Sequence, residues 1–257
     1  MSVLDPHEFA KKQFASSVPF DASIDIVATY ATDVPMVVEG SIDAIAPQGE
    51  VGRFCEIGFG SGWLMAEFAR RFPKARLFGL DLSEEFCERA HACLPTAAIA
   101  RGDMEALPFR DRAFDCVASC CALYFARDIG RALSELARVS SHRVVIAHDN
   151  LRELDEFSRQ VLSETTLEDI ASRFDLEAAW PLVKAEFPGA TRVDWRGSMR
   201  LPSADHLVKY WSGFHHQELA EQGSALLEFA RRLAPSFAAA DGSVTITRSS
   251  GAFIADL

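Results

Sequence analysis

The sequence lacks several features that identify other classes of protein. No apolar run approaches the roughly 18 residues of a membrane-spanning helix, and residues 5–12 are too polar for the core of a signal peptide. The six cysteines form no Cys-x-x-Cys pair, and the seven histidines form no His-x-x-x-His or His-Glu-x-x-His pattern. We therefore expect a cytoplasmic protein with reduced thiols, no membrane partner and no bound metal.

Basic residues are also few. Lys and Arg number 26 against 37 Asp and Glu, a net charge of −11, whereas proteins that bind nucleic acid usually carry an excess of positive charge. This balance argues against an RNA or DNA partner. With 257 residues, of which 49% are hydrophobic, the chain is long enough for one large α/β domain with additions, as a monomer or a homodimer.

Residues 53–83 have the pattern of one βαβ unit. An apolar strand at 54–57 is followed by a glycine-rich turn and by a helix with an apolar stripe that ends at Pro73. A second strand, at 77–80, ends in Asp81. Parallel sheets built from such units bind ligands at the carboxyl ends of their strands.

The glycines indicate which ligand. The run is Gly58-x-Gly60-x-Gly62, and Trp63 stands where a dinucleotide fingerprint has its third glycine. An indole there would crowd a pyrophosphate, and the carboxylate of Glu56 would repel one but suit a cation. The pattern Glu56-x-Gly58-x-Gly60-x-Gly62 resembles motif I of the class I S-adenosylmethionine-dependent methyltransferases, particularly those that act on small molecules.

Further residues match this family in order along the chain. The resemblance implies that Asp81, with Leu82 beside it, binds the ribose of S-adenosylmethionine. In the run Gly102–Phe109 it implies that Asp103 accepts from the adenine amino group and that Met104 covers the ring. Backbone near Cys120 would lie against the methionine part of the cofactor.

The residues that would act on the methyl acceptor are less well marked. Tyr124 follows the predicted strand at 114–119, and His148 follows the one at 143–147. The resemblance places Tyr124 near the substrate, and an imidazole at a sheet edge can take up a proton. Both are therefore candidate catalytic residues, although His148 has the alternative of orienting the next helix. Candidates for the pocket of the methyl acceptor are Tyr30, Tyr210, Trp211 and His215.

The predicted fold is a seven-stranded Rossmann-like methyltransferase sheet with N-terminal helices and a helical cap. Residues 1–50 would cover the site, 51–150 would form the cofactor-binding core, 151–240 a cap with one core strand near 190–197, and 241–257 a hairpin turning at 249–251.

The predicted function is transfer of a methyl group to oxygen or carbon of a small metabolite, possibly in natural-product biosynthesis. Two alternatives stay open on the same cofactor: an enzyme that catalyses a non-methylating step, and a module that senses the cofactor without turnover. A nicotinamide oxidoreductase is a more distant reading, because of Trp63 and Glu56.

Overall fold

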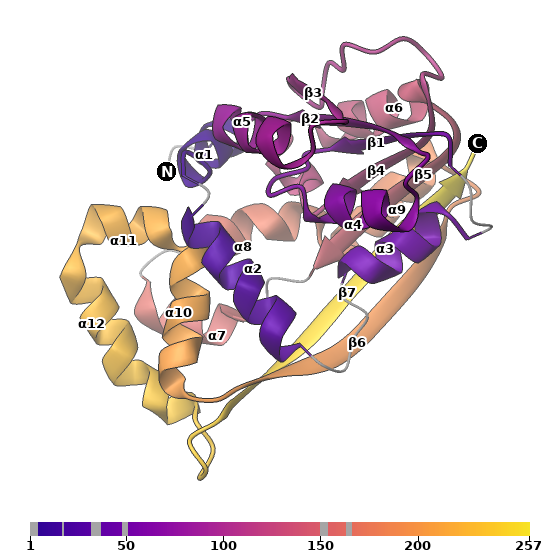
Figure 1. The fold of residues 1–257 in the computed structure, drawn as a ribbon. Coiled ribbons are helices and arrows are strands. Elements are labelled where there is room, and N and C mark those ends of the chain that lie inside the picture. The colour runs from indigo at the N-terminus through magenta and orange to yellow at the C-terminus, as the bar shows by residue number, and fades with distance from the viewer. Residues whose placement is uncertain (1–4, 17, 32–36, 48–50, 150–153, 163–165) are drawn as a thin grey trace.

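One mixed sheet organises the protein. The computed structural model describes residues 5–16, 18–31, 37–47, 51–149, 154–162 and 166–257. Within them, seven strands lie in the order β3-β2-β1-β4-β5-β7-β6, which confirms the predicted fold class (Figure 1). Among the described strand pairs, the two that include β7, with β5 and with β6, are antiparallel, and the other four are parallel. The strands are β1 (Arg53–Ile57), β2 (Arg76–Asp81), β3 (Ala98–Arg101), β4 (Phe114–Cys120), β5 (Ser140–Asp149), β6 (Thr191–Leu201) and β7 (Val244–Asp256).

Helices cover both faces of this sheet. The inner strand β1 is buried from Phe54 to Ile57, as expected for a parallel strand packed on both sides. One apolar layer joins it to α3 (Val37–Ile45), α4 (Trp63–Arg71) and α5 (Glu84–Cys93). The other layer contains α6 (Ile129–Val139) and α9 (Leu176–Glu186). Successive residues of β1 therefore serve different layers: Phe54 faces α4, and Cys55 belongs to the layer of α6.

Side-chain caps fix where several of these helices begin. Ser83 Oγ accepts from the backbone N–H of Phe86 at the start of α5, and Asp128 caps α6 through the N–H of Arg131. The N-terminal helix α1 (Pro6–Gln13) begins in the same way, with Asp5 accepting from His7. Such caps satisfy N–H groups that the first helical turn cannot pair internally.

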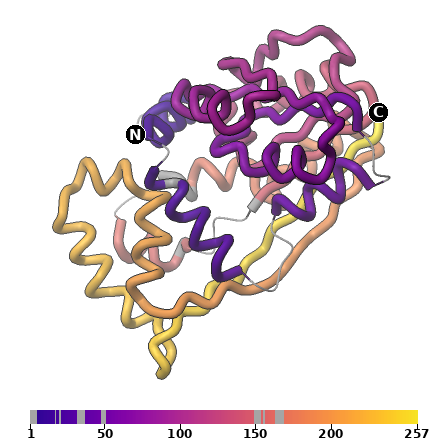
Figure 2. The backbone as a smooth tube through the Cα atoms, in the orientation of Figure 1, coloured from indigo at the N-terminus to yellow at the C-terminus, as the bar shows by residue number. Residues whose placement is uncertain are grey.

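A group of helices lies at one end of the molecule, next to the parts of β6 and β7 that extend past the other strands. In it, α2 (Val18–Tyr30) packs along α10 (Ala204–Phe214), although 173 residues separate the two (Figures 1 and 2). Ser23 Oγ donates to the backbone oxygen of Tyr210 at 2.8 Å, and a Cβ at Gly213 would overlap Ser23. In the part of the chain that the structure describes, further helices are α7 (Asp155–Val161), α8 (Thr166–Ala171), α11 (His216–Gln222) and α12 (Ser224–Leu233), and 3-10 turns include η1 (Leu123–Phe125), η3 (Ser172–Phe174) and η4 (Ala234–Phe237).

The predicted C-terminal hairpin is wrong. Residues 244–256 form one continuous strand, β7, whose antiparallel partners are β5 and β6. Gly251 does not turn the chain; it lies between His148 of β5 and Asp194 of β6. A Cβ there would come within 2.5 Å of the backbone oxygen of Val193, so glycine permits close strand packing.

The strand expected near 190–197 is β6, and it extends to Leu201. It hydrogen-bonds to β7, at one edge of the sheet. Among the residues that the structure describes, none of the helices is both long and apolar enough to span a membrane.

Candidate cofactor and methyl-acceptor site

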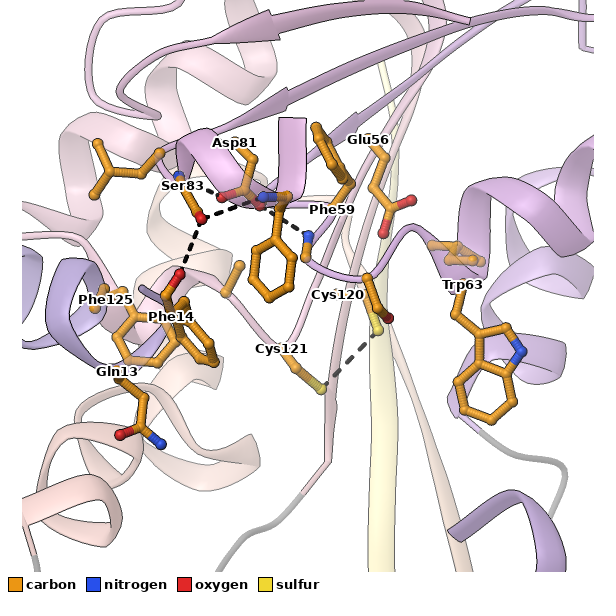
Figure 3. A pocket seen from close by; sticks show the side chains of 18 of the residues that line it. Gln13, Phe14, Glu56, Phe59, Trp63, Asp81, Ser83, Cys120, Cys121 and Phe125 are labelled. Carbon is orange, nitrogen blue, oxygen red and sulfur yellow. Dashed lines mark hydrogen bonds between the residues drawn. The ribbon is translucent and has the colours of Figure 1, made fainter. Parts of the chain in front are cut away.

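The strand order opens a crevice at one edge of the sheet. From β1 the chain builds outward through β2 to β3, and it then returns to place β4 on the other side of β1. The loops that leave β1 and β4 therefore diverge, which is the arrangement at which open α/β sheets bind ligands. A cavity lies there, lined by residues of the loops after β1, β2, β3 and β4 and of α1 and α2. Figure 3 shows several of these side chains, among them Glu56, Asp81 and Trp63.

Most of the predicted cofactor residues line this cavity. They come from four separate strand ends, and the fold brings them together around the cavity: Glu56, Gly58, Gly60, Asp81, Leu82, Asp103, Met104 and Cys120. Gly62 lies just behind, as the residue that begins α4, and Trp63 lines the cavity.

The glycine turn presents backbone to the cavity. Gly58, Gly60 and Gly62 have φ angles of 72°, 52° and 75°, in the left-handed region that favours glycine. A Cβ at Gly58 would also overlap the Cβ of Ala122, in the loop after β4. The turn is therefore sharply bent and packs closely against the loop after β4. Because glycines have no side chain, a ligand can approach its backbone.

Asp81 is held rigidly at the end of β2. Its Oδ2 accepts from the Gly60 N–H and its Oδ1 from the Ser83 N–H, both at 2.8 Å. Burial raises the pKa of Asp81 above the usual carboxyl value, although these two N–H groups act in the opposite direction. An ionised carboxylate offers about four acceptor positions, so it can still receive hydroxyl groups from a ligand.

Glu56 is a buried acid with an incompletely paired carboxylate. The residue is 2% exposed, and within the described part of the chain its Oε2 has no hydrogen-bond partner. Burial, assisted by the negative charge of Asp81, raises its pKa well above the usual range. A cationic or hydrogen-bond-donating ligand in the cavity would relieve this, so the residues present fit the sulfonium and amino groups of S-adenosylmethionine.

The N-terminal helix closes over the loop after β3. His7, which is 3% exposed, has Nδ1 3.6 Å from Asp103 Oδ2 and Nε2 3.2 Å from Glu105 Oε1. These three side chains could also approach one metal ion, so the expectation of no metal stays a prediction. Farther along, Phe14 packs its ring against Phe86 and Phe125, and its backbone oxygen accepts from Ser83.

The exit of β4 forms the opposite wall. Cys120 and Cys121 both line the cavity, and their sulfur atoms are 4.0 Å apart, well beyond the bonding distance of about 2.05 Å. Cys121 has a φ of 53°, unusual for a residue with a side chain. The chain then continues to Tyr124 and Phe125, which also line the cavity.

The two candidate catalytic residues contact each other, but only one of them lines the cavity. The ring centroids of Tyr124 and His148 are 5.4 Å apart, and Tyr124 lines the cavity whereas His148 does not. His148 is 1% exposed, and its Nε2 has no hydrogen-bond partner among the described residues. Burial lowers its pKa to about 4, against a smaller opposing effect of Asp175. At neutral pH this imidazole is uncharged.

The structure separates the four candidate residues for binding the methyl acceptor. Tyr210 lines the cavity, but Trp211 and His215 stack on each other inside the cap, where Trp211 Nε1 donates to Ser158. Tyr30 meets His206, with its hydroxyl 3.3 Å from Nε2, and is not part of the cavity wall. Tyr210 and Trp211 are adjacent in α10 and therefore lie on different faces of it, and only the face of Tyr210 is turned to the cavity.

The sequence did not identify several residues of α10, α1 and β7 that line the cavity. Phe214 is four residues after Tyr210, so it shares that face and lines the cavity too. Gln13 donates to the backbone oxygen of Phe214, which ties α1 to α10. Arg248 of β7 also lines the cavity, and it belongs to no motif. Of these residues, only Phe214 had a signal in the sequence: it lies four residues after Tyr210, so both would share one face of a helix.

Known proteins share the core of this chain. Residues 55–147 match a family model described as a methyltransferase domain. The chain is 30% identical over 126 residues to a malonyl-[acyl-carrier protein] O-methyltransferase of Halorhodospira halophila, covering 48% of this chain and 43% of that protein. It is 37% identical over 86 residues to the protein of the same name from Erwinia billingiae, covering 34% of each. The chain thus spans less than half the length of these relatives.

Solved structures share the fold over a longer stretch. A putative methyltransferase from an antibiotic biosynthesis pathway of Anabaena variabilis superimposes with a TM-score of 0.60 at 16% identity, over 87% of this chain and 98% of that one. The plantazolicin methyltransferase in complex with a triazolic desmethylPZN analogue and S-adenosylhomocysteine gives a TM-score of 0.57 at 12% identity, over 98% of this chain and 96% of that one. At such identities the likeness is one of fold.

Proposed function

We propose, from the premise that this chain belongs to the class I S-adenosylmethionine-dependent methyltransferases, that it transfers a methyl group to a small metabolite, at oxygen or carbon. The observation that carries the proposal is the wall of acids and glycines at the switch between β1 and β4. It sets Glu56 and Asp81 beside a turn that exposes backbone, with Trp63 where a diphosphate would need room.

In this proposal Asp81 receives the ribose hydroxyls, Asp103 the adenine amino group, and Met104 covers the base. Glu56 faces the positive end of the cofactor, since its Oε2 lacks a partner among the described residues. Bound S-adenosylmethionine supplies an electrophilic methyl group. The protein's task is then to align the methyl acceptor with it and to exclude water.

The cavity wall suggests how this alignment is achieved. Tyr124, Tyr210 and Phe214 supply an apolar surface that would hold a small organic molecule between α10 and the exit of β4. Tyr124 is the candidate catalytic residue, because its ring lines the cavity. His148 contacts that ring and would act through it, as a positioning residue.

The test has two stages. Calorimetry should show binding of both S-adenosylmethionine and S-adenosylhomocysteine to the purified protein. A screen of hydroxylated and enolisable metabolites with labelled methyl donor should then yield a labelled product together with S-adenosylhomocysteine. Product formed without S-adenosylhomocysteine would indicate the non-methylating alternative, and an absence of cofactor binding would refute the proposal.

A further inference from the structure

We propose that His7 is a positioning residue for the adenine end of the cofactor: it holds Asp103 where that carboxylate receives the adenine amino group. This inference rests on the proposed function, in which Asp103 meets the adenine, and adds a residue of α1 that belongs to no motif. It starts from one buried side chain, because His7 is 3% exposed and lines the same cavity as Asp103.

The imidazole of His7 lies between two carboxylates. Its Nδ1 is 3.6 Å from Asp103 Oδ2, and its Nε2 is 3.2 Å from Glu105 Oε1. An ionised carboxylate only accepts hydrogen bonds, so Glu105 favours a ring that carries a proton on Nε2. The contact with Glu105 therefore orients the ring, and Nδ1 is left on the side of Asp103.

Glu105 is itself fixed, so it can hold the ring in place. Its Oε1 also accepts from the backbone N–H of Arg127 at 2.7 Å, and its backbone oxygen accepts from the side chain of Arg131 at 2.7 Å. Asp5, which caps α1, pairs with the guanidinium of Arg127 at 2.9 Å. The start of α1 and the acid that orients His7 are thus tied to the same short segment.

Asp103 has one oxygen engaged by the backbone. Its Oδ1 accepts from the N–H of Glu105 at 2.9 Å, and its Oδ2 is the oxygen that His7 approaches. The carboxylate is therefore supported on two sides. Each oxygen of an ionised carboxylate can accept more than one hydrogen bond, so Oδ2 can also receive an N–H of a ligand in the cavity.

This support matters because Asp103 is not deeply buried. Its side chain is 36% exposed, so water competes for it and it could turn away from the ligand. A group that is already held in its binding geometry loses less conformational freedom when the ligand arrives, and the affinity rises accordingly. The imidazole of His7 supplies this restraint from α1, across the mouth of the loop after β3.

The experiment compares S-adenosylhomocysteine with S-inosylhomocysteine, in which a carbonyl oxygen replaces the adenine amino group. Isothermal titration of the parent should show a preference of about 10- to 100-fold for the adenine compound, because a carbonyl oxygen cannot donate to Asp103. His7→Leu should lower this ratio by about 3- to 10-fold, mainly through weaker binding of S-adenosylhomocysteine.

Two polar substitutions separate the contacts of the ring. The amide nitrogen of His7→Asn can take the place of Nδ1 beside Asp103, so this variant should keep part of the preference. The amide nitrogen of His7→Gln can take the place of Nε2 beside Glu105, so this variant should lose it as His7→Leu does. If His7→Leu does not fold, the comparison of these two variants decides the question.

A double substitution and a control complete the design. Asp103→Ala should remove most of the preference, and adding His7→Leu to it should cause no further change in the ratio, since His7 acts through Asp103. Lys11→Met replaces another α1 residue that lines the cavity and pairs with Glu8 at 2.9 Å, and it should leave the ratio unchanged. Thermal melts check that every variant is folded.

Three results would overturn the inference. Equal weakening of both ligands by His7→Leu would show that His7 only fastens α1. A further fall of the ratio when His7→Leu is added to Asp103→Ala would show that it does not act through Asp103. A melting temperature that Zn²⁺ or Mn²⁺ raises in the parent but not in His7→Leu would assign these side chains to a metal ion.

Failure of the inference and failure of the proposed function give different results. A parent that binds S-adenosylhomocysteine and S-inosylhomocysteine equally well would refute only the inference. A parent that binds neither S-adenosylmethionine nor S-adenosylhomocysteine would refute the proposed function as well.

Discussion

Replacement of Asp81 by asparagine tests the cofactor site with almost no change in shape. In the parent, Oδ1 and Oδ2 each accept one backbone N–H, from Ser83 and Gly60. Asparagine keeps one oxygen and turns the other into a donor, so it can serve only one of these N–H groups. It also removes the negative charge that would receive the ribose hydroxyls.

Two magnitudes follow. A hydrogen bond to a charged group contributes about 1.5–3 kcal/mol, so the loss of one such bond to the ribose should raise the Kd for S-adenosylhomocysteine about 10- to 100-fold. The backbone N–H of Gly60 or of Ser83 that is left without an acceptor should lower the free energy of unfolding by about 1–3 kcal/mol. The variant should thus remain folded but bind the cofactor poorly.

Asp115 provides a matched control. Its Oδ2 accepts from the backbone N–H of Arg53 at 2.8 Å, at the opposite end of β1 from the cavity. Asp115→Asn should therefore cost stability in the same way but leave the affinity unchanged. Isothermal titration of the parent and of both variants at the same pH measures these affinities. Folded Asp81→Asn that binds S-adenosylhomocysteine within about twofold of the parent would refute the assignment.

Two further predictions concern stability. Burial lowers the pKa of His148 to about 4, so as the pH falls from 6.5 the unfolded chain takes up a proton before the native state does, and stability is lost between these values. Urea unfolding at pH 7 and at pH 4.5 measures how much the free energy of unfolding falls between the two. This decrease should be about 2–3 kcal/mol smaller in His148→Gln than in the parent, and an equal decrease in both proteins would contradict the reasoning. Gly213→Ala should lower the free energy of unfolding by about 1–3 kcal/mol, because its Cβ would meet Ser23 where α2 crosses α10. Gly189→Ala, with nothing within 4 Å of the new methyl group, should change it by less than about 0.5 kcal/mol in the same melts.

The part of the cavity that we propose to bind the cofactor was predictable because its signals are local. The turn at Gly58–Gly62 needs left-handed backbone, which only nearby glycines supply cheaply, and Asp81 comes directly after a buried strand. Once the strands are parallel, their carboxyl ends must share one edge of the sheet, so Asp81 and Asp103 both lie at that edge and line the cavity.

The part of the cavity that we propose to hold the methyl acceptor depends on packing between distant segments. An aromatic stretch in α10 identifies a helix, but only its crossing with α2 turned Tyr210 toward the cavity and Trp211 into the cap. His148 stands at the predicted strand end, yet Tyr124 lies on the cavity wall in front of it.

The amino-acid sequence by itself determined the βαβ core, the glycine turn and the acids that follow its strands, since these depend on backbone conformation and short-range pattern. Only the tertiary structure decided that β7 runs unbroken between β5 and β6, that His7 reaches Asp103, and that Arg248 enters the cavity. Those contacts join residues far apart in the chain, and the pairing of strands and the packing of side chains fix them.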